Sequence, residues 1–449
     1  MQAKLTKAAG VVGEAWDVNT GQPVSWARKE ASWYDHAVEV AGKEWAEASA
    51  NARRSRADDL TAITMCMLDR SALARRSRPS DKDLREALSR WAFRPGRIES
   101  EAVPDRITTA LDWLSANTRP FYSLGDEQTL RALLADLSKL QNGKQASQSV
   151  IRHRRGQLSR ALDLGVTKKY LTLNPLPAYK PKRSDGRDEE VSPVCIPSRD
   201  QAARLLDALW SLSGRGTTKD RGPHLRGFFA CMYYGGLRPA EVTALLVDDL
   251  YLPATGWGRL TLRGSSPEVG ALWTDDGKAH EDRSLKHRSR KAVRVVPIPP
   301  ALVAILREHL NRFDPAPDGR IFWDGPDHKK IGKSVYSYLW ERARKAAFSE
   351  KEVASLVARR PYDLRHANAS TLLSANVNPA EVARRLGHTI KVLFAVYAHW
   401  IDTDTDIANA KIEAAFNGVP YVPHSAVTSA NVPEISGPPT GQLPESAAA

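Results

Sequence analysis

Cysteine, long apolar runs and acidic residues are all scarce in this chain of 449 residues. The three cysteines, Cys66, Cys195 and Cys231, are odd in number and lie far apart, which predicts reduced thiols and argues against a disulfide framework. The eleven histidines lack the spacing of metal ligands, so we expect no metal site. No run of about 18 apolar residues occurs and no signal sequence opens the chain, which argues against a membrane-spanning or secreted protein. We therefore expect a cytoplasmic protein with no membrane partner.

The shortage of acidic residues leaves a large positive charge. Lys and Arg number 65 against 52 Asp and Glu, which gives a net charge of +13 and an isoelectric point of about 9.6. A polyanion is therefore the favoured partner, although charge alone does not indicate sequence specificity. A basic protein with no such partner is the alternative at this point.

Composition and periodicity divide the chain into five parts. These are an N-terminal arm (residues 1–28), a helical domain (29–176), a linker (177–193), a second domain (194–418) and a disordered tail (419–449). The linker combines prolines, glycine and dense charge with almost no apolar side chain to bury. The length is sufficient for two domains with sizeable cores.

Apolar periodicity predicts mostly helix. In the helical domain one helix begins at Ser32, and others cover residues 58–69, 81–92, 106–117, 127–140 and 146–164. In the second domain a capping box at Ser198 begins a helix, and further helices are expected over 301–312, 333–348 and 402–416. Alternation predicts two antiparallel strands over 259–262 and 293–296. The predicted fold class is mainly α with a small antiparallel β-sheet.

Basic side chains gather in three clusters of the helical domain. A solvated helix face is the ordinary interpretation of one such cluster, but three in one small domain favour contacts to nucleic-acid phosphates. The side chains predicted to make these contacts are Arg53, Arg54, Arg56, Arg75, Arg76, Arg152, Arg154 and Arg155.

Residues 361–400 carry demanding side chains at recognisable helix boundaries. A helix containing Arg365 is followed by a short one that starts at the N-cap Asn378 and ends at Gly387. His388 is thus held just past a helix terminus, and Tyr397 follows it by nine residues. Neither is placed like a random surface residue.

This segment resembles the active-site box of the tyrosine recombinases, also called phage integrases. In that family His-x-x-Arg-His and then Leu-Gly-His precede a nucleophilic tyrosine. Here Arg365-His366 and Leu386-Gly387-His388 match the pattern, and Tyr397 occupies the position of the nucleophile. The chain departs from the pattern at Tyr362, where the family usually has histidine.

Two further parts of the family's site have counterparts upstream. Arg238 and Glu241, in the order Arg-x-x-Glu at a helix start, are similar to the first box of the family, although a structural salt bridge is the alternative for this pair. Integrases carry a catalytic lysine on a β-hairpin. Lys286, in the long polar insertion between the two expected strands, is our choice for it, with Lys278 and Lys291 as rivals.

The resemblance implies a role for each of these residues. Tyr397 attacks phosphorus and stores the bond as a phosphotyrosine, while Arg238 and Arg365 grip the phosphate oxygens. Lys286 protonates the leaving 5′-oxygen and His388 donates to a phosphate oxygen. The supporting residues are Glu241, Tyr362 and His366. No cofactor is required, because the covalent intermediate retains the bond energy.

The resemblance also implies an architecture and a biological role. Residues 29–176 correspond to an α-helical core-binding (SAM-like) domain and residues 194–418 to a mixed α+β catalytic domain. The expected function is a site-specific DNA recombinase, the integrase of a phage or of an integrative mobile element, similar to those of actinobacteria. Its expected partners are double-stranded attachment sites, three further copies in a homo-tetramer on paired sites, and an excision or host accessory factor. The alternatives are a type IB topoisomerase-like enzyme that relaxes DNA and a DNA-binding protein with a decayed site.

Overall fold

The computed structural model describes residues 31–43, 45–73, 77–180, 192–212, 220–285, 293–397, 400 and 405–418. Contacts divide the chain into two compact units, Met1–Ala398 and His399–Ala449, and α19 (Thr405–Phe416) is the described helix of the second unit. The expected arm and tail lie outside the described residues, as do residues 181–191 of the expected linker. No helix in the described part of the chain is long and apolar enough to cross a membrane.

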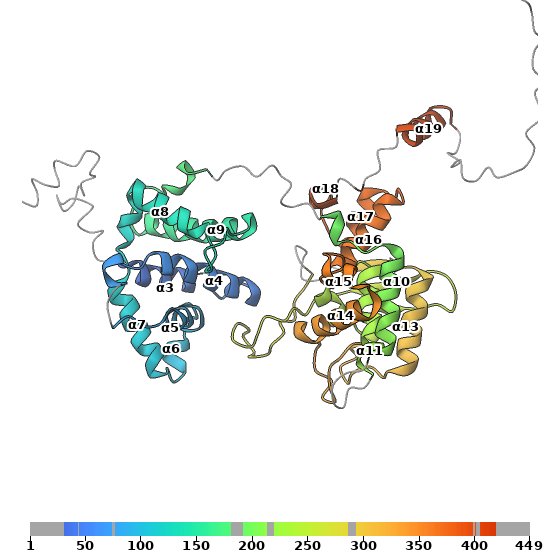
Figure 1. Ribbon diagram of the computed structural model, residues 1–449, viewed down its shortest axis with the longest axis horizontal. Coiled ribbons are helices and arrows are strands. Elements are labelled where there is room, and N and C mark those ends of the chain that lie inside the picture. The colour runs from blue at the N-terminus through green and yellow to red at the C-terminus, as the bar shows by residue number, and fades with distance from the viewer. Residues whose placement is uncertain are drawn as a thin grey trace, which may run out of the picture. The chain divides into compact units, whose positions relative to one another are not determined.

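The first part of the chain is a group of helices, drawn from blue to green in Figure 1. Its elements are α3 (Trp33–Lys43), α4 (Ala50–Cys66), η1 (Arg70–Ala72), α5 (Asp81–Glu86), η2 (Ala87–Ala92), α6 (Arg97–Ser100), α7 (Asp105–Asn117), η3 (Phe121–Gly125), α8 (Glu127–Leu137), α9 (Gln148–Thr167) and η4 (Leu176–Ala178). The helices predicted here are confirmed within a few residues, except that α4 starts well before residue 58. It does so because the Ser49 hydroxyl caps it by accepting a hydrogen bond from the amide of Ala52.

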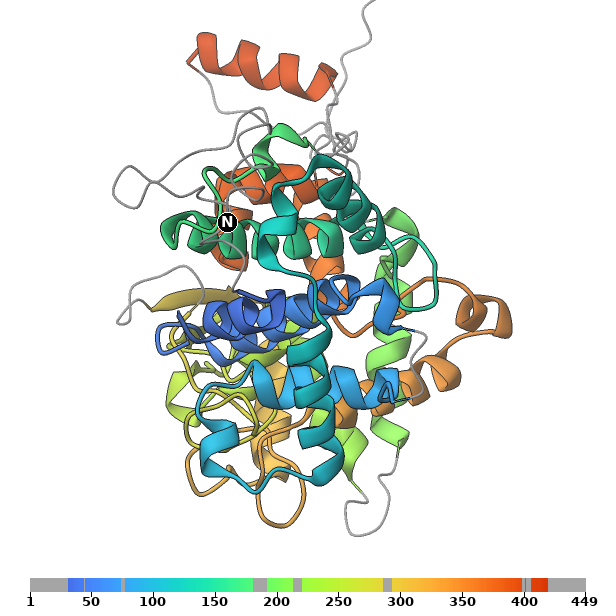
Figure 2. The ribbon, with the colours of Figure 1, turned by 90° about the vertical axis from the view of Figure 1, so that its left-hand side faces the viewer.

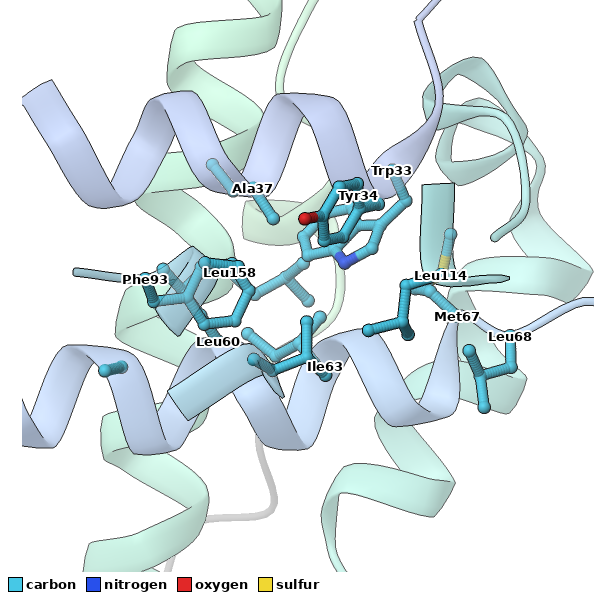
Figure 3. Packing of buried hydrophobic residues seen from close by; sticks show 14 of the residues in the cluster. Trp33, Tyr34, Ala37, Leu60, Ile63, Met67, Leu68, Phe93, Leu114 and Leu158 are labelled. Atoms are coloured by element: carbon cyan, nitrogen blue, oxygen red, sulfur yellow. The ribbon is translucent and has the colours of Figure 1, made fainter. Parts of the chain in front are cut away.

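A single apolar cluster holds these helices together. Helices α3 and α4 pack against each other and against α9, as the blue helices of Figure 2 and the close view of Figure 3 show. Trp33, Leu60 and Leu158 meet there with no exposed surface. The indole nitrogen of Trp33 donates to the Thr64 hydroxyl at 2.9 Å, so the buried polar atom is satisfied.

The second part of the chain mixes helices with one sheet and has its own apolar cluster. Its helices are η6 (Pro193–Cys195), α10 (Arg199–Ala208), η7 (Leu209–Ser211), α11 (Arg221–Tyr234), α12 (Pro239–Thr243), η8 (Val247–Asp249), α13 (Pro300–Arg312), α14 (Lys333–Ala347), α15 (Glu350–Ala354), α16 (Asp363–Ser374), α17 (Pro379–Leu386) and α18 (Ile390–Tyr397). The capping box predicted at Ser198 is confirmed. Buried apolar side chains of α11 fill the centre, where this helix contacts α10, α13 and α16.

The sheet is antiparallel, in the order β1 (Leu250–Tyr251), β2 (Gly258–Leu262), β3 (Arg294–Ile298). The two predicted strands are β2 and β3, while β1 is too short for periodicity to reveal. Leu260 pairs with Val296 and Leu262 pairs with Arg294. Buried and more exposed positions alternate along both strands, so Arg294 lies on the same inner face as Val296 and Ile298. The fold class is thus mainly α with a small antiparallel sheet, as predicted.

The turn after α17 requires glycine. Gly387 has φ +65°, the left-handed conformation expected of a helix C-terminal cap. A Cβ atom added there would lie 2.3 Å from Nη1 of Arg294, so a larger residue would also displace that guanidinium. At the other end of α17, the Asn378 side chain accepts a hydrogen bond from the amide of Ala380, as its predicted role as N-cap requires. The backbone conformation at the two ends of α17 therefore fixes the position of His388.

Candidate active site

Four helix ends and one strand bring the candidate residues together. Helix α11 stops at Gly235, Arg238 is the N-cap of α12, and Pro239 occupies the first helical position. Helix α16 contacts α11 and α17, and α17 contacts both α18 and β3. Arg365 of α16 and Tyr397 at the end of α18 therefore face the same region as Arg238.

Glu241 is the centre of a network of arginines. Arg294 binds it with both terminal nitrogens, at 3.0 and 2.8 Å, and Arg238 Nη1 donates to the same carboxylate at 3.0 Å. Burial acts to raise the pKa of Glu241, but the guanidinium of Arg294, together with those of Arg238 and Arg365, outweighs it and holds the pKa at about 2. Glu241 is therefore ionised and fixes the direction of the Arg238 side chain, which is 25% exposed.

Arg365 is fully buried beneath this network. Its Nη1 donates to the carbonyl of Gly236, and its Nη2 lies 2.7 Å from the carbonyl of Leu386 and 2.8 Å from Nε2 of His388. Because a guanidinium can only donate, Nε2 of His388 accepts, and the neutral ring carries its proton on Nδ1. Burial and the charge of Arg365 lower the pKa of His388 to about 3, which keeps the ring neutral at pH 7.

Tyr397 is 1% exposed and its phenol oxygen lies 2.7 Å from Nδ1 of His366. Burial raises the pKa of Tyr397 well above its ordinary value, against the opposing charge of Arg365, so the phenol is protonated at neutral pH. The ring of Tyr362 meets the ring of His366 edge-on, with centroids 5.0 Å apart. His366 therefore lies between the two tyrosines.

The site has more positive charge than its own carboxylate balances. Three guanidinium groups, those of Arg238, Arg294 and Arg365, surround Glu241, the one carboxylate that the described residues place among them. Among the described residues of the site, three buried nitrogens also have no hydrogen-bond partner: Nε of Arg294, Nε of Arg365 and Nδ1 of His388. Unsatisfied donors beside surplus charge are suited to an oxyanion such as phosphate.

Most of the predicted catalytic and supporting residues lie together in the structure. Those that it brings together are Arg238, Glu241, Tyr362, Arg365, His366, His388 and Tyr397. Lys286 and its rival Lys291 lie outside the described residues. Lys278 is exposed and pairs with Asp276 at 3.3 Å. No cluster of His, Cys, Asp and Glu among the described residues could hold a metal ion.

Sequence reasoning missed Arg294. A signal was present, because the alternation of the strand places Arg294 in phase with Val296 and Ile298. An arginine on the apolar face of a strand needs a buried carboxylate partner, since an unpaired charge there would be very costly.

Not every arginine predicted to contact phosphate faces solvent. Arg53 is 5% exposed and forms a bidentate pair with Asp275, at 2.6 and 3.2 Å, so in this structure it serves an internal contact. Arg154 donates to the carbonyls of Leu137 and Lys139, and Arg155 to that of Tyr179. Arg54 and Arg152 are exposed, Arg56 is half-buried, and Arg75 and Arg76 lie outside the described residues.

The partner of Arg53 lies within residues 264–285, a part of the polar insertion between β2 and β3. Val269 and Trp273 of the insertion are buried in the apolar cluster of the first part of the chain, and Glu281 accepts a hydrogen bond from the amide of Ala50 at 2.9 Å. At its base, Ser265 forms an antiparallel bridge with Arg283. The insertion therefore contributes to the core of a domain other than the one that contains its strands.

Comparison with known proteins matches residues 198–403 to the model described as the phage integrase family. A protein of Escherichia coli (strain K12) named IntQ and described as defective is 23% identical over 287 residues, which span 60% of this chain and 64% of that protein. A tyrosine recombinase of Thermosipho africanus (strain TCF52B) is 26% identical over 175 residues, 38% of this chain and 48% of that protein. The chain thus spans about half to two thirds of the length of these two relatives. Among solved structures, XerH site-specific recombinase bound to its difH substrate is 12% identical, covers 86% of this chain and 94% of that one, and has a TM-score of 0.49.

Proposed function

We propose that this chain, whose residues 198–403 match the model of the phage integrase family, is a site-specific recombinase that cuts and rejoins double-stranded DNA through a phosphotyrosine at Tyr397. The observation that carries the proposal is the group of three arginines, two of them buried, with one carboxylate, set beside a protonated phenol. A phosphodiester supplies the missing negative charge, and its phosphorus is the electrophile that a phenol oxygen can attack.

Each residue has a defined task in this mechanism. Arg238, the most exposed of the three guanidinium groups, makes the first contact with the phosphate, while Glu241 and Arg294 hold it in direction. The Nδ1 hydrogen of His388 and the unused Nε hydrogen of Arg365 donate to the oxygens of the pentacoordinate transition state. Lys286 protonates the leaving 5′-oxygen as the P–O bond breaks. In the second step a DNA hydroxyl attacks the phosphotyrosine and releases Tyr397.

Further parts of the proposal concern the partners. Exposed arginines of the first part of the chain, Arg54 and Arg152, contact the DNA backbone on either side of the cut. Recombination between two duplexes cuts four strands, and each copy of the chain supplies one Tyr397. Four copies of the chain therefore act together on paired sites. We place the protein with the integrases of phages or integrative mobile elements, with an excision or host factor setting the direction.

The test is incubation of the full chain with supercoiled plasmids that carry candidate paired attachment sites. Recombinant products are expected. Relaxation without exchange would indicate a topoisomerase-like enzyme, and binding without cleavage would indicate a decayed site. Tyr397→Phe should keep DNA affinity but form no SDS-resistant adduct on a nicked duplex, because only the phenol oxygen is removed. An adduct in this variant would show that another residue is the nucleophile.

A further inference from the structure

The proton of Tyr397 must leave before or during attack on phosphorus, and the described residues around its ring offer few acceptors for it. His388 is already engaged, since its Nε2 accepts from Arg365, and its ring centroid lies 6.4 Å from that of Tyr397. A phenol is a poor proton acceptor around neutral pH, so the side chain of Tyr362 is unsuited to this task. The neighbouring groups that remain, Arg238 and Arg365, can only donate.

His366 differs from all of these. Its Nδ1 lies 2.7 Å from the phenol oxygen of Tyr397, a distance at which an O–H group donates a hydrogen bond to a nitrogen acceptor. The two residues come from different helices, α16 and α18, so the contact depends on tertiary packing. Tyr397 is almost fully buried and His366 is half-buried, so little water competes for the hydrogen bond.

We propose that His366 is a catalytic base in this chain, which takes the proton of Tyr397 at Nδ1 while the phenol oxygen bonds to phosphorus. The inference rests on the proposed function and names the residue that activates its nucleophile. As the O–P bond forms, the O–H electron pair moves to the bond, His366 becomes an imidazolium, and the bond from phosphorus to the 5′-oxygen breaks. In the reverse step the tyrosinate leaves phosphorus and recovers the proton from His366.

The electrostatic surroundings keep His366 neutral and leave it a weak base until an anionic phosphate binds. Burial and the charges of Arg360 and Arg365 lower the pKa of His366 to about 4, so the ring is neutral and able to accept at pH 7. The anionic phosphodiester would lie against the imidazolium once it forms and would offset those positive charges. The edge-on contact with Tyr362 holds the ring in the orientation that the hydrogen bond requires.

The experiment first obtains a substrate. Wild-type protein is incubated with a pool of nicked duplexes of random sequence, and one duplex that it captures covalently, resistant to SDS, becomes the probe. Rates of adduct formation on this probe are then compared for the wild type, His366→Gln and His366→Ala. His328→Gln is the matched control, since His328 packs on Trp323 and takes no part in the site. Thermal melting and DNA anisotropy report folding and affinity.

Both His366 variants should form the adduct about 100-fold more slowly or worse, a loss typical of a missing general base, with DNA affinity unchanged. The wild-type rate should fall as the pH is lowered and the imidazole becomes protonated, and this limb should be absent in His366→Gln. The deficit should persist on a probe with sulfur in place of the leaving 5′-oxygen, because a thiolate leaves without a general acid.

Each contrary result has a distinct meaning. A near wild-type rate in His366→Gln would show that a hydrogen bond suffices and would overturn the role as base, as would rescue by the sulfur probe. If His366→Gln had a lowered melting temperature, the pH dependence of the wild-type rate on the sulfur probe would be the deciding measurement. A rate that did not fall at low pH would contradict the role of His366 as a base. Failure of the wild type to capture any duplex would refute the proposed function itself, and this inference with it.

Discussion

Arg294→Met removes the guanidinium that neutralises Glu241 from within the core. Each of the two side chains is 3% exposed, and they share two hydrogen bonds. Methionine fills much of the same apolar volume, so the loss is mainly electrostatic. Glu241 would keep the backbone amide of Arg238, at 2.8 Å, and the Arg238 side chain, which is partly exposed and donates through Nη1 alone. Breaking a buried pair and leaving one charge behind costs about 3–5 kcal/mol of unfolding free energy.

A double-mutant cycle shows whether the cost comes from the stranded carboxylate. The double variant Glu241→Gln with Arg294→Met should lose less than Arg294→Met alone, because no uncompensated charge remains in the core. Lys345→Met is the matched control: it removes a 2.8 Å pair with Glu341 in which each side chain is 62% exposed, and it should change the unfolding free energy little. Urea unfolding followed by circular dichroism gives the values for the wild type, Glu241→Gln, Arg294→Met, the double variant and Lys345→Met. A cost for Arg294→Met no larger than that for Lys345→Met would refute the reasoning.

Trp273→Ala should destabilise the helical first part of the chain by about 3–5 kcal/mol in urea unfolding, because Trp273 is 7% exposed within the core of that part. Trp257→Ala, at a 57% exposed position, is the control and should change little. Equal effects would mean that the insertion does not stabilise that core. Unfolding free energy should fall as the pH drops below about 6.5, since burial lowers the pKa of His224 to about 3 and the unfolded chain takes up protons first. Carboxylates with a lowered pKa lose their contribution to the unfolding free energy only below about pH 4.5. The loss of stability between pH 7 and pH 5 should therefore be smaller in His224→Phe. An unchanged loss would show that His224 is not its cause. Lys286→Ala should slow cleavage of an ordinary duplex far more than cleavage of one with a thiol leaving group, and equal slowing would move the role of general acid to Lys278 or Lys291.

Local sequence alone determined the boundaries that hold the site. The capping box at Ser198, Pro239 at the start of α12, Asn378 at the start of α17 and Gly387 at its end are all where the pattern predicted them. Such signals are reliable because a cap depends on hydrogen bonds between residues two to four positions apart, whatever the rest of the chain does. For the same reason, the spacing of Arg365, His388 and Tyr397 within one short segment could be recognised before any fold was known.

Tertiary structure decided which side chains are buried and which stay exposed. Arg53 and Arg54 are neighbours with the same chemistry, yet the first is buried against Asp275, 222 residues away, while the second is exposed. Arg294 became part of the site because strand pairing turned it inward toward Glu241, 53 residues earlier. The hydrogen bond from Tyr397 to His366 likewise joins two residues that are 31 positions apart and lie on different helices. Burial, charge pairing and proton transfer depend on distances of a few ångströms between remote segments, and no local pattern contains those distances.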